Sequence, residues 1–296
     1  MMELAGKTAF VTGGASGIGL ALGQAFAQVG MNVMLADIEG TALTAAVKGL
    51  SDQGLTNVCS IACDVADPVS VEEAAEATYK AFGVVHVVCN NAGVGGGDRV
   101  EDISVEDWRW VLDVNLMGVV HGIRTFLPHI RGHRQGGHIV NTASMAGMIN
   151  GLGFSPYSAS KFAVVSMSEG LAMQLAPLDI GVTVLCPGFV RTRIMECGRN
   201  RQGHYGPPRV PSPGSRAAMA AAALTNLVNS GLDPLDVARR VVTAIRQNEL
   251  YVFTHAGPEW RSELERRFNS ILLAMDRAAA NEKLGTEEAE TGATPT

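Results

Sequence analysis

Tyr157 and Lys161 are the residue pair whose types and spacing point most clearly to acid–base chemistry. Residues four apart share one face of a helix, so the lysine ammonium can approach the tyrosine hydroxyl. A free tyrosine titrates near ~10, and a nearby positive charge lowers the phenol pKa toward the range in which proton transfer is efficient. A single serine, Ser144, lies thirteen residues upstream of Tyr157. The same spacing also fits an exposed surface pair, so other motifs in the sequence are needed to distinguish a catalytic pair from a surface pair.

A glycine-rich turn near the N-terminus is a candidate nucleotide site. The run Thr12–Gly19 follows an expected strand and opens an expected helix, and its candidate binding residues are Gly13, Ser16, Gly17, Ile18 and Gly19. Glycines allow the backbone to approach a pyrophosphate, which then rests on the helix N-terminus. A tight structural turn would also favour glycine, but the strand–turn–helix context favours a dinucleotide site.

Acidic residues follow the second and third expected strands. Asp37 can accept hydrogen bonds from the adenosine ribose and would repel a 2′-phosphate. Neither Ser16 nor Ile38 supplies a positive charge for such a phosphate, so the sequence predicts NAD(H) rather than NADP(H). Asp64, with Val65 beside it, is placed to touch adenine. Either acid could instead be a turn or helix-cap residue.

Composition limits the classes of protein to consider. The 296 residues carry a net charge of −6 without a basic stripe, which argues against nucleic-acid binding. The five cysteines are scattered and odd in number, as expected for reduced thiols. We find no signal peptide and no apolar run of membrane-spanning length. These features predict a cytoplasmic protein that acts on a small molecule, with no membrane partner.

Short apolar runs alternate with amphipathic stretches along the chain. This alternation predicts an α/β fold, a doubly wound parallel sheet of about seven strands with helices on both faces. The expected strands are Thr8–Val11, Asn32–Ala36, Val58–Ala62, Val84–Cys89, His138–Asn141, Gly181–Cys186 and Leu250–Thr254. The expected helices cover about 17–29, 40–52, 69–82, 105–127, 157–176 and 234–247.

The C-terminal third departs from this alternation. Residues 198–214 are rich in proline and glycine and predict a long loop, and we expect a substrate lid over about 190–232. An amphipathic helix is expected over 260–277. We predict one domain over 1–280 and a polar, disordered tail over 281–296.

Five separated motifs occur in the order found in the short-chain dehydrogenase/reductase family, which residues 4–192 resemble. They are Thr12–Gly19, the run Asn90–Gly93, Asn115, Ser144 with Tyr157 and Lys161, and Pro187-Gly188. The resemblance implies a Rossmann-type fold and hydride transfer between an alcohol and NAD(H). The chain departs from the family pattern at His86, where many members carry an acid, and in its C-terminal segment.

The resemblance also implies residue roles. Tyr157 would be the acid/base, Ser144 would hold the substrate oxygen, Lys161 would tune the phenol and bind the nicotinamide ribose, and Asn115 would order the helix and a water chain. The remaining cofactor contacts would be Asn91, Ala92, Gly93, Pro187, Gly188, Val190 and Thr192. From the residues alone, Ser144 could instead be a strand-end turn residue and Asn115 a buried amide.

Apolar side chains near these motifs predict a bulky apolar or aromatic secondary alcohol as substrate. Beside Ser144 and Tyr157, the candidates are Met145, Met148, Leu152, Phe154, Phe189, Met195 and Tyr205, although ordinary core packing would account for some of them. Gly137–Gly147 and Leu250–His255, followed by Trp260-Arg261, resemble dehydrogenases that oxidise the Cα alcohol of lignin-derived aryl ethers.

Alternatives to this interpretation remain. Steroid or other cyclic alcohols are alternative substrates, and a catalytically inactive NAD(H)-binding sensor is an alternative of another class. A nucleotide-sugar epimerase or dehydratase is disfavoured because such proteins use a differently spaced glycine run and a larger C-terminal domain. The spacing of His129, His133 and His138 does not favour a metal site. We expect a homodimer or homotetramer.

Overall fold

A seven-stranded parallel sheet forms the centre of the protein. The computed structural model describes residues 3–96, 99–150, 155–208 and 210–291, with side chains as far as residue 281. The strand order is β3-β2-β1-β4-β5-β6-β7, which confirms the predicted doubly wound sheet. The strands are β1 (Thr8–Thr12), β2 (Asn32–Asp37), β3 (Val58–Ala62), β4 (Val87–Asn90), β5 (Gly137–Thr142), β6 (Ile180–Cys186) and β7 (Tyr251–Phe253).

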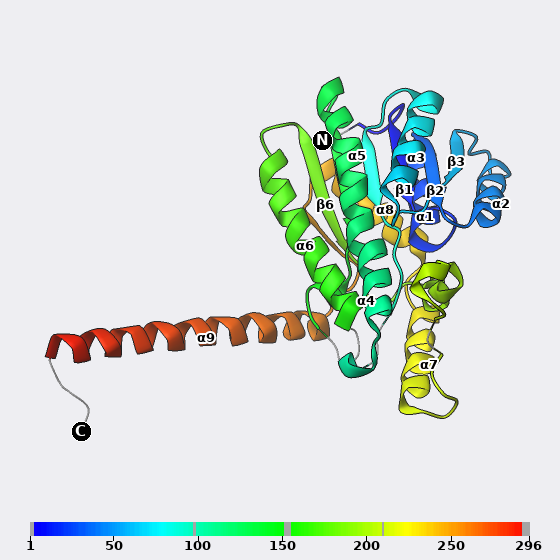
Figure 1. Ribbon diagram of the computed structural model, residues 1–296. Coiled ribbons are helices and arrows are strands. Elements are labelled where there is room, and N and C mark those ends of the chain that lie inside the picture. Colours follow the sequence, from blue (N-terminus) through cyan, green and yellow to red (C-terminus); the bar gives the residue numbers. More distant parts are fainter. Residues whose placement is uncertain (1–2, 97–98, 151–154, 209, 292–296) are drawn as a thin grey trace. The chain divides into compact units, whose positions relative to one another are not determined.

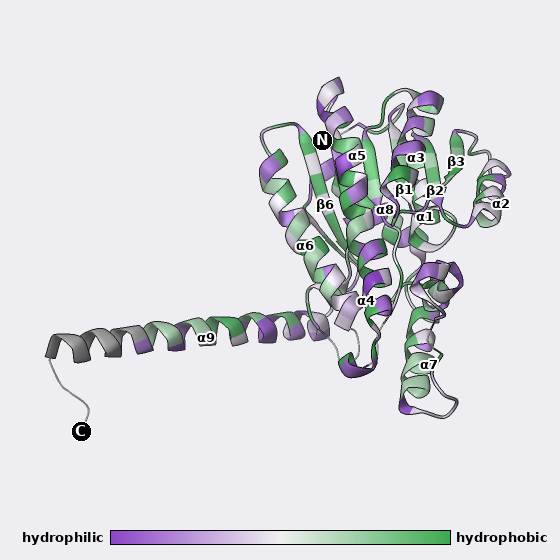
Figure 2. Cartoon of the chain, viewed as in Figure 1, coloured by the Kyte–Doolittle hydropathy of each residue, from purple (hydrophilic) through white to green (hydrophobic). Residues whose placement is uncertain are grey.

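Both faces of the sheet are buried under helices, which explains why its strands read as continuous apolar runs (Figures 1 and 2). Alternate residues of β1 illustrate the two layers: Phe10 packs into one core, while Ala9 and Val11 pack into the other. The helices α1 (Gly17–Gln28), α2 (Gly40–Ser51) and α8 (Pro234–Gln247) cover one face. The other face is covered by α3 (Pro68–Phe82), α4 (Val105–Leu112), α5 (Gly118–His133) and α6 (Ser155–Leu175).

The strand order places a crevice at the carboxyl ends of the two central strands. The chain leaves β1 toward β2 on one side, while β4 pairs with β1 on the other, with Val11 opposite Cys89. At such a switch point the loops after the two strands diverge, and ligands of doubly wound sheets bind there. The glycine-rich turn after β1, the run Asn90–Gly93 after β4, Ser144 after β5 and Pro187-Gly188 after β6 therefore lie along one edge of the sheet.

The single helix expected over 105–127 is interrupted. A π-helical turn, η2 (Asp113–Met117), separates α4 from α5. The apolar periodicity continues through the insertion, so the pattern did not reveal it. Such turns are rare and often occur at functional positions.

The segment 198–214, expected to be a long loop, contains short helical turns. Two 3₁₀ helices, η4 (Ile194–Asn200) and η5 (Gly203–Tyr205), reach into it. The helix α7 follows over Arg216–Asn229, a stretch whose many alanines favour a helix. Two further 3₁₀ helices lie earlier in the chain, η1 (Val100–Asp102) and η3 (Met145–Gly147). The lid role of this region stays a prediction.

The chain forms two compact units, Met1–Thr254 and His255–Thr296. The second contains one helix, α9 (Pro258–Thr291), which extends ten residues or so into the segment predicted to be a disordered tail. The single domain over 1–280 stays a prediction. Among the described residues, no helix is both long and apolar enough to cross a bilayer.

Candidate active site

The glycine-rich turn after β1 is shaped by close backbone contacts. Gly13 has a φ of +66°, and a Cβ on Gly19 would lie 2.0 Å from the Gly13 carbonyl oxygen. Only glycine fits such positions without displacing the turn. Asp37 supports the turn from β2, because its Oδ2 accepts a hydrogen bond from the Ala15 amide at 3.0 Å. The turn leads into α1, whose N-terminus faces the crevice.

Asn91 joins three strand ends. Its amide group donates from Nδ2 to the Thr12 carbonyl at 3.0 Å, and its Oδ1 accepts from the Thr142 hydroxyl at 3.2 Å. The Thr12 hydroxyl in turn accepts from the backbone amides of Asn91 (2.9 Å) and Ala92 (3.0 Å). The side chain of Asn91 is thus used to tie β1, β4 and β5 together, and its backbone borders the cleft.

Ser144, Tyr157 and Lys161 meet on one wall of the cleft, as the sequence predicted. Ser144 follows β5 and is hydrogen-bonded through its side chain to Tyr157. The hydroxyl of Ser144 also accepts from the Ala146 amide at 3.0 Å, which fits the strand-end turn that was the alternative reading. Lys161 is 3% exposed, and its ammonium lies 5.6 Å from the centre of the Tyr157 ring.

The pKa values at this wall are governed by burial. Burial raises the pKa of Tyr157, and the hydrogen bond from Ser144 opposes that rise only in part. The same burial lowers the pKa of Lys161 to about 8. The ammonium donates to the Thr142 carbonyl at 2.8 Å. The pKa of Tyr157 is therefore raised, with removal from water as the largest cause, and not lowered as was expected from Lys161.

Asn115 is fully buried in the π-helical turn and does not line the cleft. Its Oδ1 accepts from the Val94 amide at 2.7 Å, and its Nδ2 donates to the Val94 carbonyl at 2.9 Å and to the Ser160 hydroxyl at 3.2 Å. Ser160 donates to the carbonyl of Tyr157 at 2.7 Å. The side chain therefore positions the loop after β4 and the start of α6.

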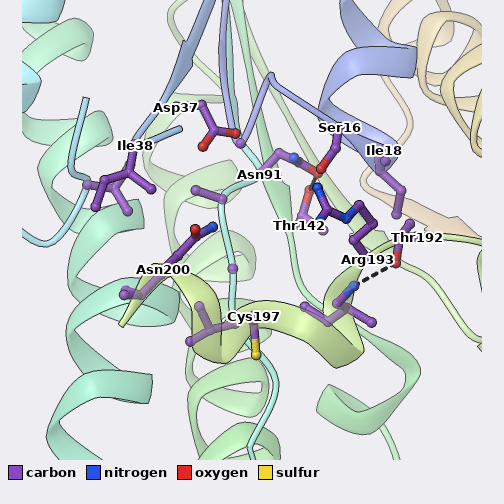
Figure 3. A pocket seen from close by; sticks show the side chains of 18 of the residues that line it. Ser16, Ile18, Asp37, Ile38, Asn91, Thr142, Thr192, Arg193, Cys197 and Asn200 are labelled. Carbon is purple, nitrogen blue, oxygen red and sulfur yellow. Dashed lines mark hydrogen bonds between the residues drawn. The ribbon is translucent and has the colours of Figure 1, made fainter. Parts of the chain in front are cut away.

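One cleft contains most of the predicted cofactor residues (Figure 3). It is lined by Gly13, Ser16, Gly17, Ile18, Asp37, Asp64, Val65, Asn91, Ala92, Gly93, Ser144, Tyr157, Lys161, Pro187, Gly188, Val190 and Thr192. Gly19 is buried behind the turn. A Cβ on Gly17 would lie 3.0 Å from Thr192 Cγ2, so the loop after β6 closes directly onto the glycine turn.

The predicted substrate residues are only partly brought together. Met145, Met148 and Tyr205 are buried and Phe189 and Met195 half-buried, and none of the five lines the cleft. Leu152 and Phe154 lie outside the described residues. Core packing, the alternative considered for these side chains, accounts for Met145 and Met148, and Tyr205 instead donates to Asp113 at 2.8 Å.

A segment that the sequence did not connect with the cofactor forms part of the cleft. We refer to residues 194–205, which contain η4 and η5, as the strap. Arg199 donates to Glu39 Oε1 from Nη2 at 2.6 Å, Asn200 donates to the same oxygen at 2.9 Å, and Gln202 donates to Asp64 Oδ2 at 2.7 Å. These contacts join residues far apart in the chain, which no local pattern encodes.

The strap is held in place by Arg201 at its centre. The side chain of Arg201 is 3% exposed, and its Nη1 lies 2.8 Å from Asp107 Oδ1. Its guanidinium also stacks over the Trp110 ring at 4.9 Å. Cys197 adds a contact on the other side, where its Sγ accepts from the Gly95 amide at 3.3 Å. The strap is thus fastened to the ends of β2 and β3, to α4 and to the loop after β4.

The donors, acceptors and glycine contacts of the cleft fit a dinucleotide. The glycine turn leaves no room for side chains beside the N-terminus of α1. At the end of β2 stands the carboxylate of Asp37, which accepts from the backbone amides of Ala15 and Glu39 and, in the described part of the chain, is bonded to no lysine or arginine. The family profile described as short chain dehydrogenase matches residues 7–202. The chain belongs to the short-chain dehydrogenase family.

Relatives in this family match nearly the whole chain. A C alpha-dehydrogenase of Sphingobium sp. is 32% identical over 273 residues, 92% of this chain and 87% of the relative. A 1-deoxy-11-beta-hydroxypentalenate dehydrogenase of Streptomyces avermitilis is 34% identical over 97% of this chain and 96% of its own length. The crystal structure of a family member from Burkholderia phymatum in complex with NAD has a TM-score of 0.87 at 38% identity, covering 93% of this chain and 97% of that one. The chain is accordingly an NAD(H)-binding oxidoreductase of this family.

Proposed function

We propose that the chain oxidises a bulky apolar secondary alcohol to a ketone, with Tyr157 as the acid/base. The observation that carries this proposal is the hydrogen-bonded pair Ser144–Tyr157 beside buried Lys161, in the same cleft as the glycine turn. When bound there, NAD⁺ accepts the hydride from the carbinol carbon.

The proton is handled by the chain's own residues. Ser144 would hydrogen-bond the alcohol oxygen and hold it against the Tyr157 oxygen, which in its phenolate form takes the alcohol proton and becomes the phenol as the ketone forms. Lys161 supplies the charge that stabilises the phenolate form of Tyr157. Because burial raises the pKa of Tyr157, the phenol holds its proton at neutral pH, a state suited to ketone reduction. Oxidation is therefore expected to be favoured by higher pH.

The cofactor would bind along the cleft from the glycine turn to Tyr157. Ser16, Gly17, Ile18 and Thr192 would face the pyrophosphate, and Asp37 the adenosine ribose. At the adenine end, Asp64 and Val65 would form the wall. The nicotinamide half would lie between Asn91–Gly93 and Pro187–Val190, with its ribose at Lys161.

The proposed substrate class rests on the apolar residues of the cleft wall and on the names of two relatives. Val190, Ile194 and Val228 are apolar wall residues. The C alpha-dehydrogenase is named for oxidation at a Cα carbon, and the 1-deoxy-11-beta-hydroxypentalenate dehydrogenase is named for a substrate that bears a hydroxyl group. We place the Cα alcohol of lignin-derived aryl ethers first and steroid or other cyclic alcohols second.

The experiment is an alcohol screen that follows NADH absorbance, with aryl ether, steroid and cyclic alcohols, on the wild-type chain and Tyr157→Phe. We expect turnover by the wild type and a loss of at least ~100-fold in the variant, with NADH binding retained. Tyr251→Phe, at a surface tyrosine bonded to Glu169, is the matched control. Full activity of Tyr157→Phe would contradict the assignment. NADH binding without turnover of any alcohol would favour the inactive sensor.

We also propose that the chain forms a homodimer or homotetramer through α9. Four apolar residues, Leu264, Phe268, Ile271 and Met275, recur at alternating spacings of four and three along this helix. Phe268, Ile271 and Met275 are 46%, 43% and 63% exposed. This is the spacing of a helix that packs against another helix. Glutamates and arginines accompany the stripe in near-equal number, so a second copy is electrostatically suited to it.

A further inference from the structure

Glu39, two residues beyond Asp37, is the centre of an ion pair that joins the strap to the loop after β2. One of its oxygens, Oε1, accepts from Arg199 Nε at 3.1 Å and Nη2 at 2.6 Å, and from Asn200 Nδ2 at 2.9 Å. The remaining nitrogen of Arg199, Nη1, donates to the Arg193 carbonyl at 3.3 Å. The strap therefore presents an arginine at the end of β2, and Glu39 balances its charge.

This ion pair is open to the cleft. The side chains of Arg199 and Glu39 are 26% and 22% exposed, and both residues line the cleft. In Figure 3, Asn200 on the strap borders the same end of the cleft as Asp37 and Ile38. A guanidinium has five N–H donors in a fork that matches the oxygens of a phosphate, and the bonds above use three of them. Arg199 thus has both the accessible surface and the donors to meet an anion.

The position of the pair relates it to the adenosine ribose. The carboxylate of Asp37, which is expected to hold that ribose, accepts from the Ala15 amide through Oδ2 at 3.0 Å and from the Glu39 amide through Oδ1 at 3.1 Å. Glu39 is thus bonded to Asp37 through its backbone and to Arg199 through its side chain. A phosphate on the 2′-oxygen of a ribose at Asp37 would stand beside this pair.

The other cations that line the described cleft are held elsewhere. Lys161 is 3% exposed and belongs to the catalytic wall. Arg193 pairs with Glu196, three residues along the chain. Arg199 is the cation bonded at the end of β2, and its hydrogen bond is the largest cause of the lowered pKa of Glu39. The carboxylate therefore stays ionised at neutral pH and keeps the guanidinium occupied.

We infer that Glu39 is a second determinant of the preference for NAD(H), because it occupies the guanidinium of Arg199 that would otherwise bind the 2′-phosphate of NADP(H). The inference rests on the NAD(H)-dependent function proposed above and adds to the repulsion expected from Asp37. With Glu39 ionised, a 2′-phosphate meets two carboxylates and a guanidinium that is already paired. Without that charge, it meets one carboxylate and a guanidinium free to make charge-assisted hydrogen bonds.

The test removes the charge of Glu39 but keeps its hydrogen bonds. All three bonds described go to Oε1, so the amide oxygen of Glu39→Gln can accept them. The dissociation constants of NADH and NADPH are measured by calorimetric titration of the full chain. We expect the wild type to bind NADH more tightly, and Glu39→Gln to shift the ratio toward NADPH about five- to tenfold. Asp236→Asn is the matched control and should leave the ratio unchanged, since Asp236 pairs with Arg239 on the surface of α8, outside the cleft.

A double-mutant cycle separates an occupied arginine from simple repulsion. In the Arg199→Gln background, the gain from Glu39→Gln should be at least about threefold smaller, because no guanidinium is left to bind the phosphate. Equal gains in both backgrounds would show that Glu39 only repels the phosphate, and would overturn the inference. A gain that Arg193→Gln removes and Arg199→Gln does not would also overturn it.

Two further outcomes concern the single proteins. An unchanged ratio in Glu39→Gln overturns the inference, as does a wild type that binds the two dinucleotides equally. A wild type that binds neither dinucleotide instead contradicts the proposed function. Each ratio compares two ligands on one preparation, so a partly folded variant does not imitate the effect.

Discussion

Lys161 shows at the scale of one residue how the site trades stability for chemistry. The ammonium is almost fully buried, faces a single backbone carbonyl among the bonds described, and has a pKa lowered to about 8. The unfolded chain binds the same proton up to a pKa near ~10.4. Between these values the unfolded state holds more protons than the folded state, so stability rises with pH across this window. Below it, the whole cost of burying the charge is present.

We therefore predict that Lys161→Met gains stability relative to the wild type at neutral pH and loses that advantage at high pH. The difference in the free energy of unfolding between the two proteins should change by ~2–3 kcal/mol between pH 7 and pH 10. Urea titrations of both proteins at each pH measure it, and most other titrating groups cancel in the difference. A difference that is constant with pH would mean that Lys161 is not a buried cation.

The sequence predicted which single residues form the site wherever their spacing in the chain determines that they meet. Ser144, Tyr157 and Lys161 come together because a helix face and a strand end place them. The direction in which their pKa values shift could not be predicted from spacing. The direction of the Tyr157 shift depends on burial by distant segments, and Cys197 of the strap contributes to it. Burial is a property of the folded chain as a whole.

At the scale of elements, the π-helical turn η2 is the feature that periodicity missed. The sequence predicted one helix over 105–127, and apolar spacing agreed with it on both sides of the turn. The extra residue in η2 is what sets Asn115 against the loop after β4, where its amide satisfies both the Val94 amide and the Val94 carbonyl. The strands and the remaining helices were predictable because each buries its apolar residues at a simple period.

We predict that Asn115→Leu lowers the free energy of unfolding by about 2–4 kcal/mol. The replacement fills the space but leaves the amide and carbonyl of Val94 buried and unpaired. Asn226→Leu, at an exposed position of α7, is the control and should change stability by less than ~0.5 kcal/mol. Urea unfolding of the three proteins provides the measurement. A loss below ~1 kcal/mol for Asn115→Leu would contradict the role of its side chain as a structural link.

The strap is the other element that sequence patterns did not place. Its glycines, Gly198 and Gly203, and the prolines that follow it in the chain indicated a break in regular structure. Because the strap is far from the second and third strands in the sequence, the pattern did not show that it would lie against them. Glu39 and Arg199 are separated by 160 residues, and Asp64 and Gln202 by 138. Local propensity does not carry information over such separations. The first part of the predicted lid is bonded to Glu39 and Asp64, which follow the second and third strands.

At the scale of the whole molecule, α9 is a helix of 34 residues that exposes a group of apolar side chains. These side chains are Phe268, Ile271, Leu272 and Met275. Most helical stability in proteins comes from packing an apolar face against a partner. Arg261 pairs with Glu265 and Arg266 with Glu263, so the helix has no excess of one charge near the stripe. A second copy of the same helix meets both requirements.

We predict that the wild-type chain is a dimer or tetramer in light scattering coupled to size-exclusion chromatography, and that the double variant Ile271→Glu with Met275→Glu lowers its mass to that of a smaller species. Two buried carboxylates facing a second helix would oppose the contact strongly. Leu273→Glu is the matched control: Leu273 is 57% exposed on the same helix, but it lies two positions from Ile271 and so faces away from the stripe. A monomeric wild type, or a double variant of unchanged mass, would exclude α9 as the interface, and equal effects of Leu273→Glu would attribute the change to added charge alone.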